Sequence, residues 1–232
     1  SEKELVDDIR RILEEILRLL RSLLEEVIRL LEERDHMVLH EYVNAAGITR
    51  RVAKLLDENG IRTDEADRVL ERLEKAHREL LEDYKRALEK IKETLERVLR
   101  EAEEVVKKID DALRKLGGSK EVLKRLLEEL LRLVEKIAEE IKRLLSELVR
   151  VTEELVRTNK ELLEEAVRVI RKEVGDDSLV REVEELIKRL EKHIDDLLKT
   201  SRDLVKRVLD LVDEVVKRVE DLVERVKEKI DT

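Results

Sequence analysis

The chain has 232 residues, of which 48% are Asp, Glu, Lys or Arg and 41% are apolar, and it contains no Pro, Cys, Phe or Trp. This composition is typical of long helices or coiled coils, so folds built on β-sheets or disulfides are excluded. The net charge of −9, from 60 acidic and 51 basic residues, excludes strong attraction to nucleic acid or anionic lipid.

Charged and apolar residues are interleaved along the whole chain. Acidic and basic side chains alternate at helical spacing, which is typical of a solvated helix face with i,i+4 pairs. No stretch reaches the roughly 18 uncharged apolar residues that a membrane span needs, and the first residues, SEKELVDD, lack the features of a signal peptide. We expect a soluble protein, cytoplasmic when expressed, with neither a membrane nor a nucleic acid as partner.

Four glycines divide the chain into segments of similar length, and each break is followed by a helix N-cap candidate with acidic residues in the next turn. The glycines are Gly60, Gly117, Gly118 and Gly175, and the candidate caps are Thr63, Ser119 and Asp177 or Ser178. The predicted helices span about 2–58, 63–116, 119–174 and 178–230. At 1.5 Å per residue, each is about 80 Å long.

Apolar residues recur in these segments with heptad-like spacing, beginning with Leu5, Ile9, Ile12 and Ile16. Further leucines beside this seam widen it into the broad apolar face that a bundle interior requires. Helices joined by short loops pack antiparallel to their neighbours. We therefore predict an all-α protein, a single-chain, antiparallel up-down-up-down four-helix bundle that forms one domain over residues 1–232.

Residues 34–49, RDHMVLHEYVNAAGIT, differ in composition from the rest of the chain. They include the chain's one Met, one of its two Tyr and two of its four His. As a helix, Val38, Tyr42, Ala45, Ile48 and Val52 prolong the preceding apolar seam at spacings of three and four. As a strand, Met37, Leu39, Glu41 and Val43 share one face, and His36, Val38, His40, Tyr42 and Asn44 share the other. Asn44 and Gly47 disfavour a helix interior, so the pattern leaves both conformations open.

This segment resembles the eleventh β-strand of green fluorescent protein, in the engineered form that serves as a self-complementing tag in split fluorescent-protein reporters. The resemblance covers Arg34, Asp35, His36, Met37, Val38, Leu39, His40, Glu41, Tyr42, Val43, Asn44, Ala45, Ala46, Gly47, Ile48 and Thr49, called the tag segment below. It implies that the segment binds the large fragment of split green fluorescent protein, strands 1 to 10.

The resemblance also implies an orientation for that bound strand. Met37, Leu39, Glu41 and Val43 would point into the barrel, and the residues of the opposite parity would point outward. The sequence after the tag segment departs from the fluorescent protein, and the chain contains neither the chromophore tripeptide nor another barrel strand. We therefore expect no fluorescence from this chain alone.

Positions reflected through the three predicted loops show which residues share a level with the tag segment. Polar residues gather at two such levels, which predicts buried hydrogen-bond networks that specify helix pairing. The alternative is that several of these side chains lie on solvated faces. The residues are His77, Thr158, Asn159 and His193 at the level of Asn44, and Tyr84, Thr152, Thr200 and Ser201 at the level of residues 36–40.

Motifs for catalysis or metal binding are weak. The chain has no phosphate-binding loop, nucleophile elbow or HExxH sequence. His36 and His40 could chelate a metal on a helix face, but both belong to the tag segment. Glu33 with His36 and Glu74 with His77 resemble the Glu-x-x-His pairs of di-iron bundles, although their levels differ. We expect no enzymatic activity, no cofactor and no metal.

The layout also resembles the latching cage-and-key family of designed switches, in which a latch helix hides a peptide until a key helix displaces it. With an aliphatic core almost free of aromatics, the sequence indicates a designed, synthetic protein. The main hypothesis is a cage that holds the tag segment helical until the first helix opens, with a key helix as a candidate partner. One alternative is a scaffold with an accessible reporter tag. Another is a pH switch driven by His77 and His193.

Overall fold

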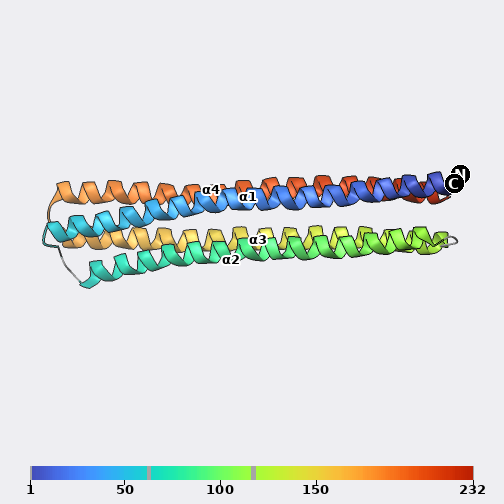
Figure 1. Cartoon of the computed structure of the whole chain (residues 1–232). Coiled ribbons are helices and arrows are strands. Elements are labelled where there is room, and N and C mark those ends of the chain that lie inside the picture. Colours follow the sequence, from blue (N-terminus) through green and yellow to red (C-terminus); the bar gives the residue numbers. More distant parts are fainter. Residues whose placement is uncertain (1, 62–63, 116–118, 232) are drawn as a thin grey trace. The chain divides into compact units, whose positions relative to one another are not determined.

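The computed structural model describes residues 2–61, 64–115 and 119–231. Within these residues the secondary structure consists of four long helices without a β-strand (Figure 1). The helices are α1 (Glu2–Glu58), α2 (Asp64–Arg114), α3 (Lys120–Glu173) and α4 (Asp177–Asp231). The predicted all-α class, with helices of about 55 residues, is confirmed.

The end of α1 shows why Gly60 terminates a helix. Gly60 has a φ of 71°, a left-handed conformation that glycine adopts without a steric cost. The N–H of Gly60 donates to the Asp57 carbonyl at 3.0 Å, and that of Ile61 donates to the Leu56 carbonyl at 2.9 Å. These two hydrogen bonds form a Schellman motif, which satisfies carbonyl groups that the helix end leaves unpaired.

The starts of α3 and α4 have side-chain caps. The Ser119 hydroxyl accepts from the Glu121 N–H at 3.2 Å, as predicted for this cap. At α4 the capping oxygen belongs to Asp176, whose carboxylate accepts from the Ser178 N–H at 2.9 Å, so the expectation of Asp177 or Ser178 was wrong. The predicted cap Thr63 and the glycine pair 117–118 lie outside the described residues.

Contacts between residues divide the chain into two compact units, and every helix contributes a segment to each. Unit 1 comprises Ser1–Leu30, Glu89–Leu145 and Lys206–Thr232, and unit 2 comprises Leu31–Leu88 and Ser146–Val205. The tag segment belongs to unit 2. That residues 1–232 form one domain stays a prediction.

Ion pairs establish the helix order in unit 1. Ion pairs join α1 to both α2 and α4, and they join α3 to the same two helices. Where two ion pairs join the same two helices, the higher residue number on one helix is paired with the lower number on the other, so the chain directions are opposite (Figure 1). The pairs are Arg10–Asp110 and Arg21–Glu103, Arg97–Glu140, Lys142–Asp213 and Lys227–Glu128, and Arg218–Glu15 and Lys229–Asp8. The helix segments of unit 1 are therefore antiparallel to their neighbours.

Unit 2 has the same order of helices. Two ion pairs join α2 to α3 and three join α3 to α4, again with opposite chain directions, while side-chain contacts join α1 to α2 and to α4. The ion pairs are Arg72–Glu165, Lys172–Glu65, Lys160–Asp195, Arg171–Glu184 and Arg202–Glu153. The up-down-up-down arrangement therefore holds within this unit as well.

Each unit has an apolar core made from the predicted seams. In unit 1 this core includes Ile9, Leu13 and Ile16 of α1 together with Leu127 and Leu130 of α3, all buried. In unit 2 the buried cluster includes tag residues Ala45 and Ile48 as well as scaffold residues. Burial of one such Leu or Ile side chain contributes about 1.5–3 kcal/mol, so these seams hold the helices together.

Candidate functional site in the tag segment

All sixteen residues of the tag segment are helical and continue α1 without a break. The buried residues Leu31, Val38, Ala45 and Val52 recur every seven positions, so the segment keeps the seam of the helix on both sides of it. A Cβ added at Gly47 would meet open space, so the packing around this residue does not require a glycine. The apolar seam therefore outweighs the poor helix propensity of individual tag residues.

Burial in the tag segment follows the helical period. Val38, Ala45, Ile48 and Thr49 are buried, as the helical pattern predicted for the first three. Tyr42 was expected in the buried seam but is only half-buried. The half-buried group also contains Arg34, Asp35, Glu41, Asn44 and Ala46, and the exposed group is His36, Met37, Leu39, His40, Val43 and Gly47.

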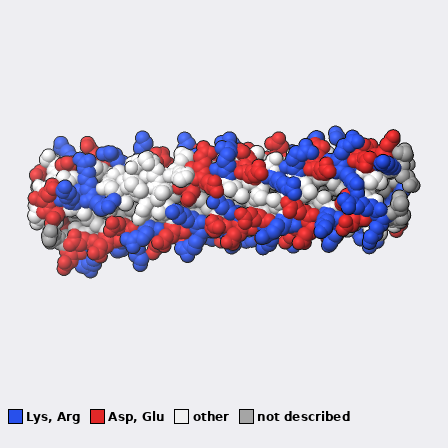
Figure 2. All heavy atoms as spheres, viewed as in Figure 1, with Lys and Arg blue, Asp and Glu red and all other residues white. Residues whose placement is uncertain are grey.

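The exposed face of the tag segment is unusually apolar for this chain. Met37, Leu39 and Val43 have exposed fractions of 44%, 40% and 54%. Figure 2 shows Lys, Arg, Asp and Glu over most of the visible face, with a white area over the part of α1 that contains the tag segment. In an extended strand these three side chains share one face. The helix therefore leaves in solvent the apolar residues that the resemblance places inside a barrel.

Three polar groups of the tag segment face polar residues from the rest of unit 2, and the first is Thr49. Its hydroxyl donates to the Ala45 carbonyl at 3.0 Å and lies 3.5 Å from His77 Nε2 of α2. On α3, the Asn159 amide NH₂ donates to the Leu155 carbonyl at 2.8 Å, while its buried Oδ1 has no hydrogen-bond partner. Thr49, His77 and Asn159 are all buried.

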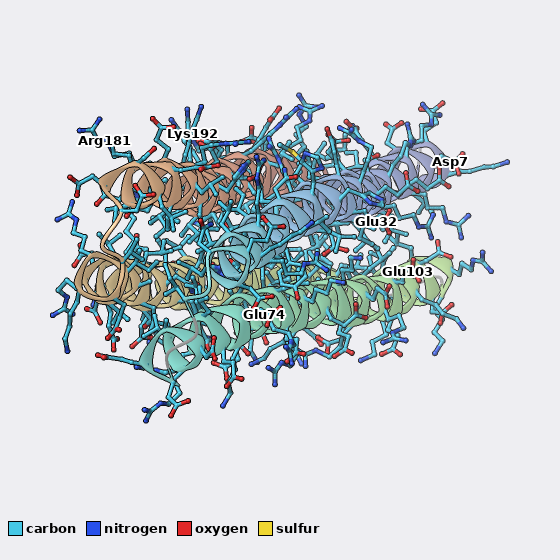
Figure 3. The ribbon with its side chains drawn as sticks, turned by 90° about the vertical axis from the view of Figure 1, so that its left-hand side faces the viewer. Asp7, Glu32, Glu74, Glu103, Arg181 and Lys192 are labelled. Carbon is cyan, nitrogen blue, oxygen red and sulfur yellow. The ribbon has the colours of Figure 1, made fainter. Side chains whose placement is uncertain are left out.

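Burial changes the acid–base behaviour of His77. Loss of contact with water lowers the pKa of His77 from 6.5 to about 4, because a charged imidazolium is poorly solvated in the core. Asn159 opposes this shift, because its side-chain oxygen can accept a hydrogen bond from the charged ring. His77 is therefore neutral at pH 7 and has one N–H to share between two neighbouring oxygens. In Figure 3, the labelled Glu74 marks the part of α2 that carries this residue.

The second polar group of the tag segment is Glu41. Its carboxylate makes a hydrogen bond with His193 Nδ1 of α4, and both side chains are about one-quarter exposed, at 22% and 26%. Lys192, labelled in Figure 3, marks this part of α4. This contact links the tag segment to the helix on its other side.

The third polar group is Asp35, near Tyr84 of α2. Tyr84 is 1% exposed, and burial raises the pKa of its phenol. The Ser201 hydroxyl and the charge of Arg34 lower that pKa, and the charge of Asp35 raises it. Tyr84 OH and one Asp35 carboxylate oxygen are both buried, and neither makes a hydrogen bond.

The remaining polar residues expected in networks bond mainly within their own helices. Thr152 and Ser201 are buried, and their hydroxyls donate to the Leu148 and Leu197 carbonyls at 2.7 and 3.0 Å. Thr200 is half-buried. Thr158 is exposed and donates to the Glu154 carbonyl, so its predicted burial was wrong. A Ser or Thr hydroxyl in a helix can donate to the backbone carbonyl four residues earlier, so it does not need a hydrogen-bond partner on another helix.

The predicted levels were only partly correct. His77 and Asn159 lie together as expected, but the tag residue beside them is Thr49 and not Asn44. The polar tag residues that make the contacts, Glu41 and Thr49, were not singled out from the sequence as network members. Thr49 lies four residues after the seam residue Ala45, and this helical spacing is the signal that could have identified it.

The described residues contain no group of three or more His, Cys, Asp or Glu side chains able to hold a metal ion. The Glu-x-x-His pairs do not converge, because Glu33 and His36 are exposed while His77 is buried. His40 is exposed beside His36 on α1. The contacts of the tag segment are suited to holding a helix in place.

The chain is similar to a computationally designed three-helix bundle, with 20% sequence identity and a TM-score of 0.43 over 99% of this chain and 90% of that chain. No model of a known protein family matches the chain, and no curated protein does. None of the helices in the described part of the chain contains a segment apolar enough to cross a membrane.

Proposed function

We propose that this protein is a designed helical cage for the tag segment. In this function, unit 2 holds the tag segment as a helix, and the large fragment of split green fluorescent protein binds it only after that part of α1 opens. The observation that supports the proposal most directly is the burial of Val38, Ala45 and Ile48 in the core of unit 2, within a segment whose alternation also suits a strand.

The two conformations exclude each other. Sixteen residues span about 24 Å as a helix and about 53 Å as a strand. In the helix the backbone N–H and C=O groups bond to each other, whereas pairing with neighbouring strands needs the same groups free. The large fragment therefore competes with unit 2 for one segment.

Bundle stability then sets the apparent affinity for the large fragment. If the closed state is favoured by about 4 kcal/mol, the competent fraction and the apparent affinity both fall roughly a thousandfold. The contacts of Thr49 with His77 and of Glu41 with His193 add to the buried seam in favouring the closed state. A designed key helix that competes for the partners of α1 is a candidate trigger.

Complementation tests the cage directly. The chain and a free peptide of residues 34–49 are each mixed with the large fragment, and fluorescence is followed over time. We expect rapid signal from the peptide and much slower or weaker signal from the chain, with recovery when mild denaturant destabilises unit 2. Equal rates for peptide and chain would overturn the cage.

The second candidate is a helical scaffold with an accessible reporter tag and no switching. The exposure of Met37, Leu39 and Val43 favours it, because the side chains expected inside the barrel already lie in solvent. Hydrogen exchange over residues 34–56 separates the two functions. Strong protection is expected for the cage, and exchange close to that of an unfolded peptide is expected for the accessible tag.

A further inference from the structure

We propose that acid opens the cage through His77, because protonation of this imidazole beneath Thr49 favours the open state of the tag segment. This inference rests on the proposed function and adds a means of regulating it. It depends on two features of unit 2: the burial of His77, and the absence of a carboxylate bonded to it among the described residues.

The hydrogen-bonding roles around His77 follow from the contacts. The Thr49 hydroxyl uses its proton on the Ala45 carbonyl, so towards His77 Nε2 it can only accept. The Asn159 NH₂ is bonded to the Leu155 carbonyl, and its Oδ1 is an unpaired acceptor. Both neighbours thus present oxygens that could accept from a charged ring, but the loss of solvation on burial is the larger influence on His77 and disfavours the charge.

No acidic side chain among the described residues is bonded to His77 in the closed state. From α1, Glu41 and Tyr42 line the same small cavity as His77, and from α4 His193 does so. Glu41 is already bonded to His193. The neighbour from α3 is the neutral Asn159, and the other cavity-lining residues of α2, Leu80 and Leu81, are apolar. A proton on His77 is therefore costly while the tag segment covers it.

Opening of the tag segment removes Thr49 from His77 and lets water reach the ring. The pKa of His77 then rises from about 4 towards its ordinary value of 6.5, so the open state binds more protons between these two values. The closed state has its full advantage above pH 6.5 and loses it as the pH falls towards 4. Between pH 7.5 and pH 5, the ratio of open to closed molecules should rise about thirtyfold.

His193 provides a comparison on the other side of the tag segment. Its bond to Glu41 joins α4 to this segment. The two histidines provide matched variants, His77→Gln and His193→Gln, of which only the first removes the buried imidazole.

Hydrogen exchange of the isolated chain over residues 34–56 tests the inference at pH 7.5 and pH 5, after correction for the intrinsic pH dependence of exchange. The native chain should show an increase in opening of about thirtyfold at pH 5. His77→Gln should abolish most of this increase, and His193→Gln should preserve it. An unchanged native chain, or the same increase in His77→Gln, would overturn the inference.

Two additions keep the test decisive. Circular dichroism establishes whether His77→Gln is helical, and if it is not, His77→Leu provides an apolar side chain without a titrating proton in the same place. The exchange measurement does not involve the large fragment. If exchange responds to pH but complementation by the native chain matches that of the free peptide, the proposed cage fails while the acid response of unit 2 stands.

Discussion

The two units use the same helices to build different interiors. The core of unit 1 is aliphatic, and its one buried polar residue among those described, Thr94, is satisfied by the Lys90 carbonyl of its own helix at 2.9 Å. In unit 2 the buried polar residues are Thr49, His77, Thr152, Asn159 and Ser201. Polar burial is therefore concentrated in the unit that contains the tag segment.

This difference shows two ways to hold a helix. Aliphatic side chains stabilise a helix contact through the apolar area that they bury, and this effect has no preferred direction. A buried hydrogen-bond donor or acceptor is costly unless a partner lies opposite it, so it favours one register of the helices. The tag segment includes two alanines and a glycine in succession, Ala45, Ala46 and Gly47, and so has less apolar surface to bury than the leucine-rich start of α1. Polar contacts at Glu41 and Thr49 add directional constraints to this weaker seam.

The largest expected effect on stability comes from truncating one buried leucine in each unit. Leu130→Ala in unit 1 and Leu163→Ala in unit 2 truncate fully buried leucines of α3, and each should lower the free energy of unfolding by about 2–5 kcal/mol. Chemical denaturation measures this loss. Hydrogen exchange of the tag segment should rise strongly only for Leu163→Ala. An equal rise for both variants would mean that the units open together.

A smaller effect is expected at the unpaired hydroxyl of unit 2. Tyr84→Phe removes a buried OH that has no hydrogen-bond partner, so it should raise the free energy of unfolding by about 1 kcal/mol. Tyr42→Phe, at a half-buried position, is the control and should have little effect. A loss of stability in Tyr84→Phe would instead show that the phenol bonds to Ser201 or Asp35 in solution.

The smallest effect concerns helix propensity within the tag segment. Gly47→Ala adds a methyl group into open space and should stabilise the closed helix by about 0.5–1 kcal/mol. Complementation by the chain should slow by a few-fold. A free peptide with the same substitution controls for any change in affinity for the large fragment. If chain and peptide slow equally, the closed state was not affected.

Much of the fold could be predicted from residue patterns, and less of the site. Glycine positions and heptad spacing locate the four helices because helix ends and apolar periodicity are local properties. Burial of His77 and Asn159 was also predicted. The exposure of Thr158 and the half-burial of Tyr42 were missed, since one residue of helix rotation, about 100°, separates a core position from the surface.

The sequence by itself determined the helical class, the lengths of the helices and the foreign composition of residues 34–49, because these depend on propensity and periodicity along one chain. Only the tertiary structure decided that the ambiguous segment is helical, that Met37, Leu39 and Val43 face solvent, and that Thr49 covers His77. The physical reason is that a segment compatible with two conformations adopts the one whose neighbours bury its apolar seam. Those neighbours lie on helices far away in sequence.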